Sequence, residues 1–189
     1  EGATTVNHSG GAGFRLNGEG QGEVRNTEFV NNGSSGVTIQ GGARGRADGI
    51  TVTGGLIGVS IWGNSEGTLT NSTITGATNG IQVNGPAKAD LIDNTCTRNI
   101  RFGIAFYGNA TGIVRGNTLK ENDFGFYVQE TACPEVTQNI CANNKTTGIS
   151  VQLNASPVLD ENQCTANGVH GIYVGENSAP VIRNNRCDT

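Results

Sequence analysis

The chain has 189 residues, of which 30 are glycine, 34% are apolar and 5% are aromatic, and its net charge is −4. This mild acidity supplies no basic stripe for nucleic acid, and no apolar stretch approaches the roughly 18 residues of a membrane span. The low apolar content would fit disorder if the charge were high, but the charge is small and the apolar residues recur at fixed positions. The composition therefore favours an ordered repeat with a thin core.

One sequence unit is repeated eight times along the chain. Each unit opens with glycine, an apolar residue, any residue and a second apolar residue, and the intervals are 22 or 23 residues, with the glycines at Gly13, Gly36, Gly58, Gly80, Gly103, Gly125, Gly148 and Gly171. A fixed period in this range is typical of a stacked solenoid. We therefore expect a single domain over residues 1–189, with a partial coil at 1–12 and complete coils that start at the eight glycines.

The first element of each coil is a short strand that begins at its glycine, which we number position 0. Positions 1 and 3 are apolar in every coil, as in Val37 and Ile39 or Ile104 and Phe106. Because strand side chains alternate, these two positions lie on one face and positions 2 and 4 point outward.

Two further short strands follow in each coil. Position 11 is apolar throughout, as in Leu69 and Leu91, and position 16 holds residues such as Phe29, Ile74 and Cys96. Three strands in about 22 residues close a coil, and parallel strands of successive coils stack about 4.8 Å apart. A leucine-rich repeat has a similar period but needs a leucine consensus, which is absent. The sequence predicts an all-β, right-handed parallel β-helix of about eight coils.

The turns between strands contain recurring asparagine, proline and cysteine. Asparagine recurs at position 14 and position 19, and proline recurs at position 9 as Pro134, Pro157 and Pro180. Asparagine tolerates left-handed backbone angles and can satisfy backbone groups at a bend, so both columns indicate packing. Position 16 holds four of the five cysteines, at Cys96, Cys141, Cys164 and Cys187, which we expect to be buried and unpaired. Cys133 lies in a turn and should be exposed.

The complete repeat resembles the right-handed parallel β-helix repeats of carbohydrate-binding proteins and sugar hydrolases, which share the pectin-lyase-like fold. Two sequence motifs carry this resemblance. They are the four-residue pattern that opens each coil, which we call the glycine tetrad, and the segment from Val136 to Asn144. Asp-Pro-His, the motif of the related uronate epimerases, is absent, as are the Asp-Asp pair and Gly-His-Gly string of polygalacturonases. The resemblance implies a fold and leaves the activity open.

In enzymes of this fold the resemblance places the substrate along an outward strand face. The outward positions 2 and 4 contain aromatic and amide side chains that suit the faces and hydroxyls of sugar rings; they are Trp62, Tyr107, Tyr127, Tyr173, Gln82, Asn84, Gln129 and Gln152. Outward aromatics are also favoured simply as strand residues. We predict these eight as candidate carbohydrate-binding residues.

Four charged or titratable residues lie in the turn before the first strand. Arg101, Asp123, Lys145 and His170 are candidates to bind a carboxylate or exchange a proton if the protein is catalytic. Glycoside hydrolysis generally needs two carboxylates facing one bond, and no such pair is evident. Ordinary solvated turn charges are the competing interpretation.

A third candidate surface is formed by the last strand of three consecutive coils. It reads Thr-x-Thr at residues 51–53, 73–75 and 95–97, and it breaks at Lys120. Flat arrays of this kind resemble ice-binding faces, although threonine is also a favoured outward strand residue.

The leading hypothesis is a carbohydrate-associated module that binds or presents a polysaccharide or surface glycan. A structural spacer or protein-interaction solenoid is the first alternative, and a polysaccharide lyase or uronate epimerase is the second. We expect no metal site and no cofactor, with calcium left open. We also expect an extracellular or periplasmic location, and a chain that is a segment of a longer solenoid whose other domains are partners.

Overall fold

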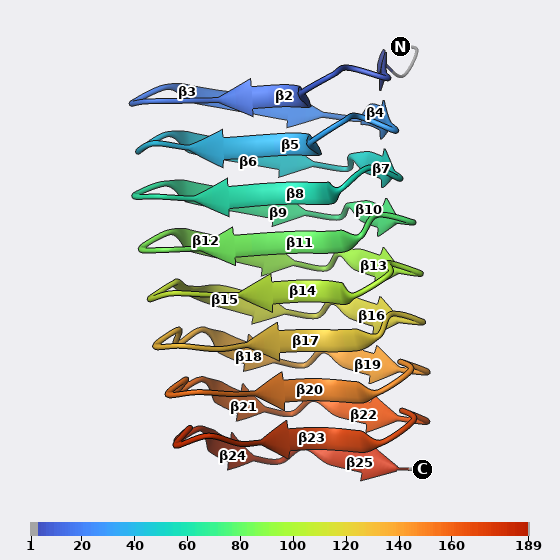
Figure 1. Cartoon of the computed structure of the whole chain (residues 1–189), viewed down its shortest axis with the longest axis vertical. Coiled ribbons are helices and arrows are strands. Elements are labelled where there is room, and N and C mark those ends of the chain that lie inside the picture. The colour runs from blue at the N-terminus through green and yellow to red at the C-terminus, as the bar shows by residue number, and fades with distance from the viewer. Residues whose placement is uncertain (1–3, 189) are drawn as a thin grey trace.

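The computed structural model describes residues 4–188, which form 25 strands and no helix. The strands stack into three parallel sheets, and each coil contributes one strand to each sheet (Figure 1). The expected parallel β-helix with three strands per coil is confirmed.

Each sheet runs the length of the stack. Sheet A contains β1 (Thr4–Asn7), β4 (Thr27–Val30), β7 (Thr51–Thr53), β10 (Thr73–Thr75), β13 (Thr95–Thr97), β16 (Thr118–Lys120), β19 (Ile140–Ala142), β22 (Gln163–Thr165) and β25 (Arg186–Asp188). Sheet B contains β2 (Ala12–Leu16), β5 (Ser35–Gln40), β8 (Ile57–Trp62), β11 (Asn79–Asn84), β14 (Phe102–Phe106), β17 (Phe124–Val128), β20 (Thr147–Val151) and β23 (His170–Val174). Sheet C contains β3 (Gln21–Arg25), β6 (Arg44–Asp48), β9 (Glu66–Thr70), β12 (Lys88–Ile92), β15 (Thr111–Arg115), β18 (Glu135–Thr137), β21 (Val158–Asp160) and β24 (Val181–Arg183).

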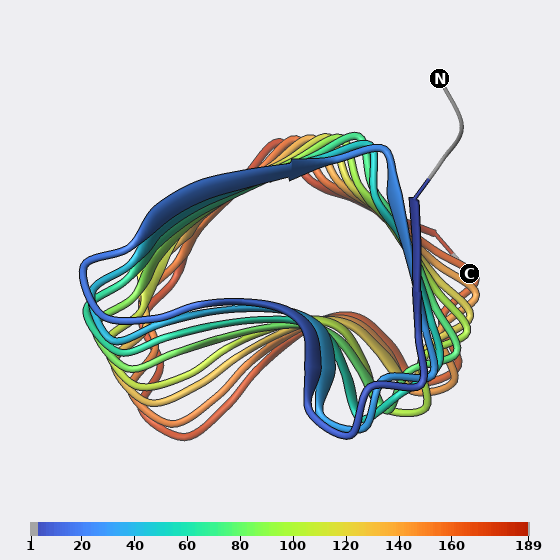
Figure 2. The same cartoon turned by 90° about the horizontal axis from the view of Figure 1, so that it is seen from above.

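The register between coils follows the repeat without slippage. Ile81 pairs with Val59 on one side and with Ile104 on the other, so equivalent positions are vertical neighbours. Viewed along the stack, the coils superpose and one side of their outline bends inward (Figure 2). A residue type repeated at one position therefore becomes a column on one face of the molecule.

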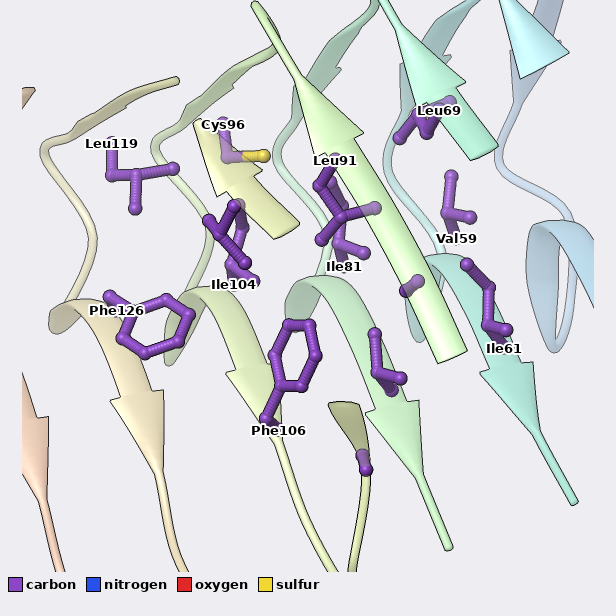
Figure 3. Packing of buried hydrophobic residues seen from close by; sticks show 14 of the residues in the cluster. Val59, Ile61, Leu69, Ile81, Leu91, Cys96, Ile104, Phe106, Leu119 and Phe126 are labelled. Atoms are coloured by element: carbon purple, nitrogen blue, oxygen red, sulfur yellow. The ribbon is translucent and has the colours of Figure 1, made fainter. Parts of the chain in front are cut away.

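The core is a set of apolar columns that project inward from all three sheets. Phe106 and Phe126 are completely buried, with ring centroids 5.8 Å apart, and they lie close to Ile104 and Leu119 (Figure 3). Burying each large apolar side chain contributes about 1.5–3 kcal/mol. These columns form one continuous core along the stack, and the hydrogen bonds between parallel strands join the same coils.

Glycine brings sheet C close to sheet B in the first coils. A Cβ on Gly45 would lie 2.5 Å from Ile39, and one on Gly67 would lie 2.6 Å from Ile61. Any larger inward side chain would overlap the core column of sheet B.

The asparagine columns lie inside the turns and are fully hydrogen-bonded. Asn117 donates from Nδ2 to the carbonyl of Leu91 and to Oδ1 of Asn139, both at 2.9 Å. Asn94 at position 14 and Asn99 at position 19 are both buried. The predicted structural role of both columns is confirmed.

The cysteines follow the prediction with one exception. All five are free, Cys133 is exposed, and Cys96, Cys141 and Cys164 are buried. Cys187 was expected to be buried, but it is exposed because the structure describes no further coil to cover it. Burial raises the pKa of the Cys96 thiol far above its ordinary value, which makes it unreactive.

Candidate functional site

The strongest concentration of outward aromatic side chains lies on sheet B, in strands β14 and β17 and the residue after β14. Four rings come together there, and we call this group the aromatic cluster: Phe102, Tyr107, Phe124 and Tyr127. Tyr107 and Tyr127 come from adjacent coils, and their ring centroids are 6.0 Å apart. Because positions 1 and 3 fill the core, the alternation of strand side chains places Tyr127, at position 2, and Tyr107, at position 4, on the outside.

The rings of the cluster pack against one another, and Phe102 is buried whereas Tyr107, Phe124 and Tyr127 are partly exposed. Phe102 lies 4.7 Å from Tyr127 and 6.4 Å from Tyr107 between ring centroids. Phe124 meets Tyr127 edge-on at 5.6 Å. Burial raises the pKa of Tyr107 to about 12. The cluster is therefore a fixed apolar platform and not a set of free aromatic side chains.

Polar groups surround the platform on two sides. The Tyr127 hydroxyl lies 2.7 Å from Oε1 of Gln129 and 3.2 Å from Oε1 of Gln152. The Arg101 guanidinium lies 4.8 Å from the centre of the Phe102 ring. Aromatic faces beside amides and a guanidinium can contact both the C–H groups and the hydroxyls of a sugar.

A hollow of about 210 Å³ continues the same face toward the last coils. Phe124, Gln152, His170 and Tyr173 are among its lining residues. The His170 and Tyr173 rings stack with centroids 5.3 Å apart. Since Phe124 belongs both to the cluster and to this hollow, the two features form one surface over four coils.

Trp62 lies outside the cluster, at the end of β8 and two coils before Tyr107. Its side chain is 47% exposed, and it borders a separate hollow of about 220 Å³ with Thr38 and Ser60. The intervening coil contributes Gln82, which accepts a hydrogen bond from Asn79, and the exposed Asn84. The eight predicted binding residues therefore share one face of sheet B, on or directly after consecutive strands from β8 to β23.

The four candidate catalytic residues do not converge. Asp123 accepts a hydrogen bond from Thr146 at 2.9 Å, while Arg101 lies over Phe102 and Lys145 is exposed. None of the ion pairs among residues 4–188 includes any of the four. The described residues bring no two of these side chains together as an acid and base pair.

Metal-ligating side chains are not gathered within the described chain. Residues 4–188 contain no group of three or more His, Cys, Asp or Glu that could hold a metal ion. The same residues form no helix long and apolar enough to cross a membrane.

Sequence reasoning missed two members of the aromatic cluster, Phe102 and Phe124. Both lie one residue before the repeat glycine, at a position whose other occupants include Ser35 and Asn79. Counted back from positions 2 and 4, strict alternation places the glycine outside and this position inside. In the structure a Cβ on the glycine would point to the interior, toward Asn122 at Gly103 and Asn144 at Gly125, so the alternation is broken there and no sequence signal marks either ring.

The fold and this face define a class of protein, a parallel β-solenoid with an aromatic surface along one sheet. The family model for the right handed beta helix region matches residues 3–132 and 79–189. The chain belongs to this family, and the match confirms the expected right-handed β-helix over the whole chain. No curated protein matches the sequence.

Proposed function

We propose that the outward face of sheet B binds polysaccharide, with the aromatic cluster as the platform on which sugar rings stack. The observation that carries this proposal is the packing of Phe102, Tyr107, Phe124 and Tyr127 into one platform. Their mutual contacts hold the rings in place before a ligand arrives, so less conformational entropy is lost on binding.

The arrangement of polar groups supports an extended ligand. Gln129 and Gln152 lie within hydrogen-bonding distance of the Tyr127 hydroxyl beside the platform. The hollow lined by His170 and Tyr173 continues the surface by one to two coils. Successive coils repeat about every 4.8 Å, so a linear chain of sugars laid along the stack meets a new coil at short intervals.

The test is retention of the protein by polysaccharides in affinity electrophoresis, after a glycan array has identified a ligand. We expect Tyr127→Ala to weaken binding roughly tenfold, the effect of losing one aromatic contact of about 1.5 kcal/mol. Tyr127→Phe keeps the ring and should retain most of the affinity.

Ile140→Ala is the matched control, because Ile140 is an exposed apolar side chain on sheet A. Its retention should equal that of the wild type. If no glycan on the array is bound, or if Tyr127→Ala and Ile140→Ala bind as well as the wild type, the proposal is wrong. A protein that acts only as a structural spacer would bind no glycan on the array.

A further inference from the structure

A third hollow lies on the outer face of sheet C, away from the aromatic cluster. Its volume is about 320 Å³, and its lining comes from β3, β6, β9 and β12. We call it the sheet C hollow, and define it by the side chains of Arg44, Arg46, Glu66, Thr68, Lys88 and Asp90.

The strand register fixes how these side chains are arranged. Arg46, Thr68 and Asp90 are vertical neighbours in successive coils. Arginine and aspartate are therefore two coil spacings apart, about 9.6 Å, with the short threonine side chain between them. Thr68 therefore lies between the two charged side chains of this column.

The two arginines already have partners. Arg44 lies 3.3 Å from Glu66, and Arg46 lies 3.4 Å from Glu23. Their side chains are more than half exposed, so each ion pair contributes at most about 1 kcal/mol and a competing anion can replace the carboxylate.

Lys88 and Asp90 are different, because neither takes part in an ion pair among residues 4–188. The Oδ1 atom of Asp90 is buried and accepts no hydrogen bond within the described chain. An unsatisfied buried acceptor is costly, and such a group in a folded protein calls for an explanation. In the next coil the same column holds Ile113, so the fold does not require a carboxylate there.

We propose that the sheet C hollow is a second binding site, which takes a sugar or other polyol that carries an anionic group. A ligand hydroxyl donates to the carboxylate of Asp90, and the anionic group pairs with Lys88 and Arg46. The lining has three cations and two carboxylates, which favours an anionic ligand over a bare metal cation. The site lies on a different sheet from the aromatic cluster and does not depend on the function proposed for that surface.

The experiment is an NMR titration of the full chain with a sulfated disaccharide, compared with its unsulfated parent. It is performed in a Tyr127→Ala background, so that binding at the aromatic cluster does not obscure the result. We expect the sulfated sugar to shift the backbone amides of Thr68 and Asp90 and the Lys88 side chain. Lys88→Met should weaken binding about tenfold, as expected for a lost charge-assisted hydrogen bond.

Asp90→Ile separates a binding role from a structural one. It should abolish measurable binding and raise the midpoint of thermal unfolding, since it removes the unsatisfied carboxylate and matches Ile113 in the next coil. Lys120→Met, on sheet A, is the control for the loss of one positive charge and should bind like its parent. The proposal is overturned if the unsulfated sugar binds equally, if the shifts lie elsewhere, or if Lys88→Met and Asp90→Ile leave the affinity unchanged.

Discussion

Asn122 shows how a single residue connects three coils. Its Nδ2 donates to the carbonyl of Cys96 in the coil before and to Oδ1 of Asn144 in the coil after. Its own Oδ1 accepts from the backbone and the side chain of Asn99. An asparagine column is therefore a continuous hydrogen-bonded stack inside the turns, because each side-chain amide offers both a donor and an acceptor to its neighbours.

We predict that Asn122→Ala lowers the free energy of unfolding by about 2–4 kcal/mol, because it leaves the Cys96 carbonyl and the Asn99 amide buried without partners. Chemical denaturation measures this loss. Asn64→Ala, at an exposed turn position, is the control and should stay within about 0.5 kcal/mol of the wild type. Equal stability of the two variants would show that the column is dispensable.

Asp48 makes a pH-dependent contribution to the stability of the folded protein. Hydrogen bonds from Thr70 and then Asn71 hold its pKa below the ordinary value of 3.8. Since the folded-state pKa is the lower one, the stabilisation is complete above the unfolded-state pKa and is lost as the pH falls through the folded-state pKa. The midpoint of thermal unfolding of Asp48→Ala should therefore be lower than that of the wild type at pH 7, and the difference should shrink below about pH 4. A difference that stays constant from pH 7 to pH 2 would contradict this account.

At the scale of the strand, the repeat glycine is required by the approach of neighbouring backbones. A Cβ on Gly103 would lie 2.6 Å from the carbonyl oxygen of Gly125 and 2.9 Å from Nδ2 of Asn122. The glycine thus makes room for the asparagine column behind the strand. The tetrad and the column are two parts of one packing arrangement, which explains why they share a period.

The same period made the strands, the register and the core columns predictable from sequence. Every coil must satisfy the same backbone and packing constraints, so each repeats the same residue types. The aromatic cluster was predicted only in part, because ring-to-ring contact depends on side-chain directions that the period does not encode. Tyr107 and Tyr127 were found as outward residues, whereas the two phenylalanines that join them were not. The sheet C hollow was missed altogether, since its charged residues vary from coil to coil and form no column.

At the scale of the whole molecule, each coil contacts chiefly the coils above and below it. The strand order of all three sheets follows the coil order without a crossover between distant coils. The stability of such a solenoid is approximately a sum of coil and nearest-neighbour terms. A defect in one coil should therefore act locally, unlike a cavity in a single globular core.

Gly103→Ala tests this local coupling in the middle of the stack, because the new Cβ would collide with the backbone of the next coil. We predict that native-state hydrogen exchange speeds up most in β11, β14 and β17, while β5, β8 and β23 stay protected. Gly11→Ala is the control, since a Cβ there meets nothing within 4 Å and protection should not change. If Gly103→Ala instead lowered protection equally in all eight strands of sheet B, the solenoid would unfold as one cooperative unit. The aromatic cluster and the sheet C hollow are centred on different coils as well as on different sheets. If the loss of protection is local, each of these two surfaces can be altered without unfolding the other.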